Sequence, residues 1–123
     1  PPPCDSLHFA DLSPRIKLSL EGTSEQHDAI FGRGVAQLCR GVDRTGSLNK
    51  AAKEIGMAYS KAWRIIKHTE EAFSMQLLDR NGAHGSTLTD EGKALLDAYE
   101  RLEQDIERFA QERIEAIASD LDR

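Results

Sequence analysis

The sequence predicts a mainly α-helical fold with a small β-wing, and three observations lead to this prediction. Apolar residues recur at helical spacing in two segments that a single glycine, Gly56, separates. Two short strand-like segments follow at 77–80 and 86–88, with two glycines between them. The chain then continues into a long amphipathic segment, residues 89–123. This order is typical of a winged helix-turn-helix with an N-terminal strand and a long C-terminal helix.

The N-terminal region predicts a tail and then a strand. Residues 1–14 open with three prolines, and we expect them to form a flexible tail. The winged helix-turn-helix domain is placed at 15–88. Its first seven residues alternate polar with apolar side chains, which predicts a half-buried strand that ends at Gly22. A helix is expected next, ending at Gly46, with an inner face of Val35, Leu38, Cys39 and Val42.

The helix-turn-helix itself is predicted from Ser47 to Phe73. Its first helix is short and ends at Gly56, because glycine readily adopts the left-handed backbone conformation of a helix exit. The second helix is expected at about 59–73. The inner face of the first helix is Leu48, Ala51, Ala52 and Ile55, and that of the second is Ala62, Ile65, Ile66, Thr69 and Phe73. Trp63 is expected to pack inside, because aromatic side chains contribute most when buried.

The outer face of the second helix is the candidate contact surface for DNA. The N-terminal part of such a helix reaches base edges in the major groove, and residues further along meet phosphate. A wing supplies further contacts to phosphate or the minor groove. Candidate DNA-binding residues are Asn49, Lys50, Tyr59, Ser60, Lys61, Arg64, Lys67, His68, Arg80 and His84. A solvated helix face and a plain hairpin tip stay open as alternatives for each single residue.

The distribution of charge favours one basic contact face. The whole chain has a formal net charge of −5, yet residues 48–88 hold six basic against four acidic residues, a net charge of +2. Residues 89–123 hold eleven acids against five bases, a net charge of −6, and residues 1–47 contribute −1. A basic island on an acidic protein favours nucleic-acid contact at that island alone.

Three segments carry a resemblance to a known family. The sequences GSLNKAAKEIGMAYSKAWRIIKHTEEAF, LLDR and LTDEGKALLDAYERLE resemble the N-terminal winged-helix domain of ModE-like, molybdate-responsive transcription regulators, which is related to the LysR-type domain. The most specific part runs from Gly56 to Trp63, and the whole resemblance covers roughly Arg15 to Glu103. It implies a DNA-binding homodimer that regulates transcription. The N-terminal strand favours the ModE-like branch.

Two departures from that family limit what the resemblance implies. The wing tip, residues 80–87, is shorter than the glycine-rich wings of ModE-like domains. The chain also ends at residue 123, before the oxyanion-binding domains of the molybdate regulators, so molybdate sensing is not expected of it.

The last segment, 89–123, predicts a dimerisation arm. Thr89 is expected to cap the helix, with Asp90 and Glu91 in its first turn. Apolar residues from Leu95 to Phe109 recur at alternating steps of four and three, and those from Ala110 onward continue this rhythm shifted by one position. This is the spacing of a coiled-coil seam with a one-residue offset. The candidate dimerisation residues are Leu95, Tyr99, Leu102, Ile106, Phe109, Ile114 and Ile117, and Ala110 and Leu121 continue the pattern. A helix folded back on its own domain is the alternative.

Other functions find little support in the residues. We expect no enzyme, catalytic residue, cofactor or metal site, because the chain has no phosphate-binding glycine loop and no nucleophile beside a base. No apolar run could cross a bilayer, and a cytoplasmic location is expected. Cys39 is expected in the core or an interface, with redox sensing as a weaker alternative. The alternative function is a protein-interaction module that docks through its acidic C-terminal helix.

Overall fold

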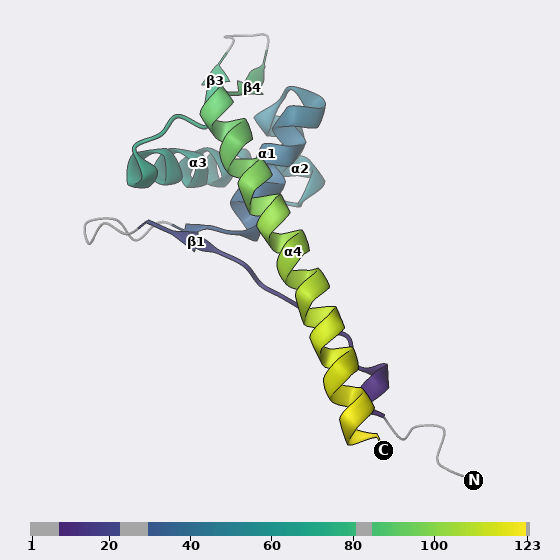
Figure 1. Ribbon diagram of the computed structural model, residues 1–123. Helices are drawn as coiled ribbons and strands as arrows, with labels where there is room; N and C mark the ends of the chain where they lie inside the picture. Colours follow the sequence, from purple (N-terminus) through teal and green to yellow (C-terminus); the bar gives the residue numbers. More distant parts are fainter. Residues whose placement is uncertain (1–7, 23–29, 81–84, 123) are drawn as a thin grey trace. The chain divides into compact units, whose positions relative to one another are not determined.

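The computed structural model describes residues 8–22, 30–80 and 85–122 (Figure 1). It confirms the mainly helical fold class with a small β-wing and a long C-terminal helix. The described residues divide into two compact units, one from Lys17 to Glu100 and one of the residues up to Ile16 with those from Arg101 onward. The elements in chain order are η1 (Phe9–Asp11), β1 (Leu20–Glu21), β2 (Ile30–Phe31), α1 (Arg33–Thr45), α2 (Leu48–Glu54), α3 (Tyr59–Phe73), β3 (Leu78–Arg80), β4 (Ser86–Leu88) and α4 (Asp90–Leu121).

The core of the Lys17–Glu100 unit lies between α1, α2, α3 and the first turns of α4. Gly41 in α1 lets α2 approach closely, because a Cβ atom at this glycine would lie 2.5 Å from the Cβ of Ala51. The predicted inner residues of α1 and α2 are confirmed, except that Ile55 is half-buried. Fully buried side chains include Phe31, Leu38, Cys39, Val42, Ile66, Leu77 and Tyr99.

The turn between α2 and α3 forms as the sequence predicts. The Ser47 side chain accepts a hydrogen bond from the Lys50 backbone N–H and caps the start of α2. At the other end Gly56 has a φ of +70°, and the N–H groups of Gly56 and Met57 donate to the carbonyls of Lys53 and Ala52. This is a Schellman motif, in which the glycine is the residue with the left-handed backbone conformation.

The N-terminal strand is shorter than predicted. Of the described residues in this segment, only Leu20 and Glu21 pair with a partner, the antiparallel strand β2. The predicted alternation is nevertheless present, since Ile16, Leu18 and Leu20 are half-buried and the residues between them are exposed. The strand does not extend toward Ile16 because, in this register, the residues before Leu20 face Gly32 and those after it, where the chain enters α1.

The wing is a two-stranded antiparallel hairpin tied to the helices. Arg80 pairs with Ser86, and the Ser86 N–H also donates to the Gly46 carbonyl at 2.9 Å, in the turn between α1 and α2. The Thr89 hydroxyl accepts from the Gly92 N–H at 2.9 Å, which confirms the predicted cap of α4. The wing therefore has a fixed position beside the helix-turn-helix.

Tyr99 corrects the predicted dimerisation seam. Its ring is only 1% exposed and meets the Phe31 ring edge-on, with 5.4 Å between centroids. Its hydroxyl donates to the Leu18 carbonyl at 2.9 Å. The assignment of Tyr99 to the dimer interface is therefore wrong, because the core of its own unit uses this side chain. Leu95 also packs partly against that core.

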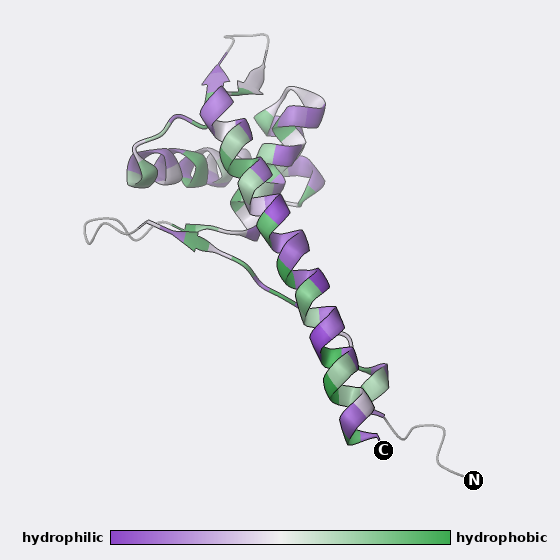
Figure 2. Cartoon of the chain, in the orientation of Figure 1, coloured by the Kyte–Doolittle hydropathy of each residue, from purple (hydrophilic) through white to green (hydrophobic). Residues whose placement is uncertain are grey.

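The second unit contains η1 and the rest of α4. The Ala10 N–H donates to the Asp122 carboxylate at 3.2 Å, and Ala118 is 1% exposed. Within the predicted tail, Phe9–Asp11 form a 3-10 helix. Hydrophobic residues occur along α4 in this unit (Figure 2). The exposed ones include Leu102 and Phe109, which are 41% and 65% exposed.

Candidate nucleic-acid interface

Helix α3 has one buried face and one polar face, as its sequence predicts. Ala62, Ile66 and Thr69 are buried, whereas Ile65 and Phe73 are only half-buried and Ala72 takes the remaining inner position. The polar face stays in solvent. Its exposed residues are Ser60, Lys61, Arg64, Lys67 and His68.

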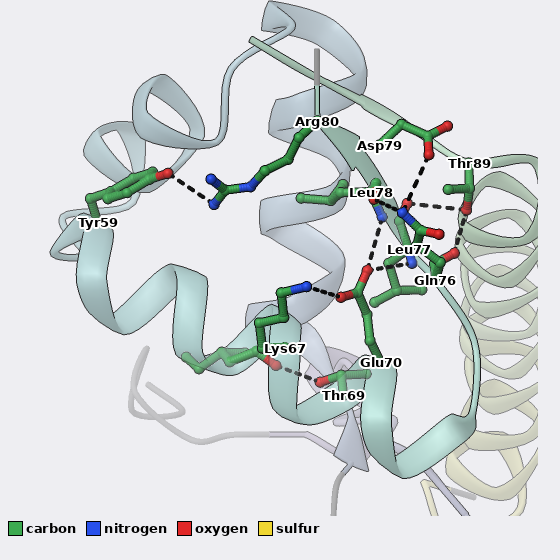
Figure 3. A network of polar contacts seen from close by, with 11 residues as sticks. Tyr59, Lys67, Thr69, Glu70, Gln76, Leu77, Leu78, Asp79, Arg80 and Thr89 are labelled. Carbon is green, nitrogen blue, oxygen red and sulfur yellow. Dashed lines mark hydrogen bonds and ion pairs between the residues drawn. The ribbon is translucent and has the colours of Figure 1, made fainter. Parts of the chain in front are cut away.

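The wing residue Arg80 contacts the start of α3. Its guanidinium carbon lies 3.4 Å from the centre of the Trp63 ring, a cation–π distance. The same guanidinium donates a hydrogen bond of 3.2 Å to the Tyr59 hydroxyl, and Figure 3 shows the two side chains pointing toward each other. The structure thereby brings together two predicted site residues, Tyr59 and Arg80, from α3 and β3.

A hollow of about 400 Å³ lies beside this contact and gathers a third predicted residue, Asn49. Among the described residues that line it, Arg80 is the only charged one. These lining residues are Ser47, Leu48, Asn49, Tyr59, Arg80, Gly85 and Ser86. Lys50 is exposed on α2 but does not line the hollow, and His84 lies outside the described residues.

Arg64 and His68 line a separate hollow of about 330 Å³ with Ile30, Ile65 and Thr69. Helix α3 therefore contributes predicted site residues to two hollows, Tyr59 to one and Arg64 with His68 to the other. The first of them also includes residues of α2 and the wing.

The positive charge of Lys67 is partly neutralised by Glu70. Its Nζ lies 3.6 Å from a Glu70 carboxylate oxygen and 4.7 Å from the centre of the Trp63 ring. The other Glu70 oxygen accepts from the Leu77 and Leu78 backbone N–H groups at 2.7 and 3.2 Å (Figure 3). Glu70 thus joins the end of α3 to the wing.

Two residues with a part in this site were not predicted from the sequence. Trp63 was expected inside, yet it is half-buried and holds two cations over its ring. Glu70 enters the sequence analysis only as one of the four acidic residues of the segment 48–88. The available signal was its place four residues after the buried Ile66, on the inner edge of the helix, where a charged group needs partners.

The residues of this surface could bind an anion. Cations from α3 and the wing stand beside neutral donors such as Asn49 and Tyr59, a combination suited to phosphate oxygens. No cluster of three or more His, Cys, Asp or Glu residues in the described ranges could hold a metal ion. No described helix is long and apolar enough to cross a membrane.

Cys39 is unsuited to sensing. Its side chain is fully buried, and this burial, with the nearby negative charge of Glu70, raises the pKa of the thiol to about 12. The positive charge of Arg40 lowers the pKa of the thiol, but by less than burial and Glu70 raise it. The reactive form of a cysteine is the thiolate, so both observations favour a core role over redox sensing.

The comparison with known proteins agrees with this geometry. The family described as "Bacterial regulatory helix-turn-helix protein, lysR family" matches residues 36–93, which is 58 of the 123 residues. The HTH-type transcriptional regulator TdcA of Escherichia coli (strain K12) is 34% identical over 71 residues, which cover 58% of this chain and 22% of that protein. The chain thus spans about a fifth of the length of this curated relative.

Solved structures show the same fold bound to DNA. The BenM_DBD/benA site 1 DNA complex is 25% identical, with a TM-score of 0.55, and the match covers 71% of this chain and 94% of that one. The CbnR_DBD-DNA complex has the same TM-score at 24% identity, and the match covers 68% of this chain and 94% of that one. At this identity the likeness supports the fold and nothing further. Residues 36–93 of this chain are thus similar in sequence to the helix-turn-helix domain of the lysR family.

Proposed function

We propose that this chain is the DNA-binding part of a sequence-specific transcriptional regulator, with α3 in the major groove of double-stranded DNA. The observation that carries the proposal is the exposed polar face of α3, with Arg80 of the wing held against its first turns. Regulator TdcA and the DNA complex of the BenM domain support it by similarity.

The charges on α3 favour DNA over a protein partner. Among the described residues, Lys61 and Arg64 have no acidic group within ion-pair distance, whereas Lys67 is paired with Glu70. Two unpaired cations on one exposed face suit a polyanion. Ser60, Lys61 and Arg64 would reach base edges, and Lys67 and His68 would meet phosphate.

We further propose that the regulator acts as a homodimer through α4. The support is the apolar surface that α4 leaves exposed in the second unit, above all Leu102 and Phe109, with Ile117 and Leu121 at 39% and 55% exposure. Ile106 and Ile114 are half-buried between them. Two such helices could cover each other's apolar seam and set the spacing of two half-sites, simplest at about 34 Å.

The ModE-like branch remains part of the proposal. It is supported by the residues from Gly56 to Trp63 and by the paired strands β1 and β2 before α1.

Selection from a random DNA library at near-physiological salt, combined with the mass of the protein in solution, tests the function. The expected result is an enriched two-fold symmetric sequence bound by a dimer. No enrichment, with background binding that salt abolishes, would overturn DNA recognition and favour the protein-interaction alternative.

Two substitutions test the assignment of α3. Arg64→Ala should cost ~1–3 kcal/mol of binding free energy on the selected sequence and relax the base preference. Lys67→Ala should weaken binding to all sequences alike and lower the salt dependence by about one ion. If both variants bound the selected sequence as tightly as the parent, α3 would not be the reading helix.

A further inference from the structure

Trp63 is the only tryptophan of the chain, and it stands at the junction of α3 and the wing. It is half-buried, with one cation from each element over its ring, Arg80 at 3.4 Å and Lys67 at 4.7 Å. A core tryptophan would be covered by apolar side chains. This one packs against the core and also leaves part of its ring for two positive charges.

Arg80 is held from two directions. The Trp63 ring lies against its guanidinium carbon, and the Tyr59 hydroxyl accepts from one of its terminal nitrogens at 3.2 Å. A guanidinium carries five N–H donors, and stacking on a ring uses none of them. The other donors therefore remain for an anion, on a side chain that has already lost most of its freedom before binding.

The hollow of about 400 Å³ beside Arg80 suits a tetrahedral anion. Arg80 supplies the single charge among its described lining residues, while Asn49, Ser47 and Ser86 supply neutral polar groups. In a duplex-binding protein the anion that meets such a surface is a backbone phosphate.

We infer that Trp63 is a positioning residue for DNA binding, which fixes Arg80 so that its guanidinium meets a backbone phosphate at the hollow between α2, α3 and the wing. This inference rests on the proposed function. Trp63 acts through Arg80 and contacts no base. The wing and α3 then bind DNA as one coupled surface, because the ring that fixes Arg80 belongs to α3.

A double-mutant cycle on the selected DNA sequence tests the coupling. Arg80→Ala should weaken binding by about ten-fold and lower the salt dependence by about one ion. In the Trp63→Leu background, the loss of affinity caused by Arg80→Ala should be about five-fold smaller. This is the factor expected for one cation–π contact. Trp63→Phe keeps an aromatic face, so the loss of affinity caused by Arg80→Ala in this background should lie between the losses in the parent and in Trp63→Leu. Arg108→Ala, which removes an equal charge from an exposed position on α4, is the control and should leave binding unchanged.

Tryptophan fluorescence separates positioning from mere folding. Because the chain holds one tryptophan, its emission reports the surroundings of this ring, which include the Arg80 guanidinium. Arg80→Ala should change the emission of the free protein without lowering its unfolding midpoint, whereas Arg108→Ala should change neither.

The outcomes that overturn the inference differ from those that overturn the proposed function. If the parent binds its selected DNA but Arg80→Ala costs the same affinity in the parent and in the Trp63→Phe and Trp63→Leu backgrounds, Trp63 does not position Arg80. An emission spectrum that Arg80→Ala leaves unchanged would overturn the inference as well. If the parent selects no DNA sequence at all, the proposed function falls, and the inference falls with it.

Discussion

The Glu70 carboxylate accepts a hydrogen bond of 2.7 Å from the Leu77 backbone N–H, and through it the last turn of α3 is fixed to the segment that begins the wing. The same oxygen accepts from Leu78 at 3.2 Å. The Glu70 side chain is only 11% exposed, so little water competes for these bonds. Hydrogen bonds to an ionised acceptor are roughly twice as strong as neutral ones.

Glu70→Ala should therefore lower the free energy of unfolding by about 1.5–3 kcal/mol, because two backbone N–H groups lose a charged acceptor. Glu70→Gln should lose less, since its amide oxygen still accepts. Urea denaturation measures both. The neighbouring Glu71 is exposed, and Glu71→Ala should stay within about 0.5 kcal/mol of the parent. Equal losses at the two positions would contradict the role of Glu70.

Local spacing explains what could be predicted from the sequence. The exposed face of α3 and the cap at Thr89 depend on residues three or four positions apart, and the structure has them as expected. The contact of Arg80 with Trp63 depends on how the wing folds back, which no local pattern encodes.

Tyr99 shows the same limit in the predicted seam. Alternating steps of four and three place apolar residues on one face of a helix, whatever surface covers that face. The first turns of α4 are covered by the chain's own core, where Tyr99 meets Phe31. Spacing alone could not distinguish this core from a second copy of α4.

Gly41 and Gly34 offer a matched pair of substitutions within α1. A Cβ at Gly41 would lie 2.5 Å from the Cβ of Ala51 and 3.0 Å from its Cα, so α1 and α2 would have to separate. Gly41→Ala should cost about 1–3 kcal/mol of stability, as overpacking does. A Cβ at Gly34 meets nothing within 4 Å, and Gly34→Ala should be neutral or stabilise by up to about 1 kcal/mol.

Thermal and chemical denaturation of both variants check this prediction. The opposite signs matter more than the magnitudes, because both substitutions add one methyl group to the same helix. A Gly41→Ala variant as stable as the parent would mean that α1 and α2 do not approach closely at this point.

The Cys39 thiol should resist modification in the folded protein. Its burial raises the pKa to about 12, so at pH 8 the thiolate fraction is on the order of 10⁻⁴. In a Cys4→Ser variant, a disulfide reagent should therefore react ~1,000-fold more slowly than with a free cysteine, and at the normal rate in denaturant. Fast labelling of the folded protein would contradict the buried position.

The same thiol should lower the stability of the protein in alkali. Its folded pKa, about 12, lies above the ordinary value of 9.0, so below pH 9 both states hold the proton and the thiol has no effect. Between pH 9 and 12 only the unfolded state releases it, which favours unfolding, by about 1 kcal/mol at pH 10. Cys39→Ala lacks this proton and is the control. The parent should lose more stability than the variant from pH 8 to pH 10 in urea denaturation.

Substitutions at Leu102 and Tyr99 test the proposed dimer seam separately from the core. Leu102 is 41% exposed, and Leu102→Asp should produce monomers in analytical ultracentrifugation, because a charge would be buried without a partner between two copies of α4. Ile106→Asp should act in the same way. Tyr99→Phe removes the 2.9 Å bond to the Leu18 carbonyl and should cost about 1 kcal/mol of stability while the dimer persists. If Leu102→Asp and Ile106→Asp remained dimeric, the apolar residues of α4 would not form the interface. If Tyr99→Phe alone became monomeric, the seam would begin in the first turns of the helix, despite the burial of Tyr99 in its own unit.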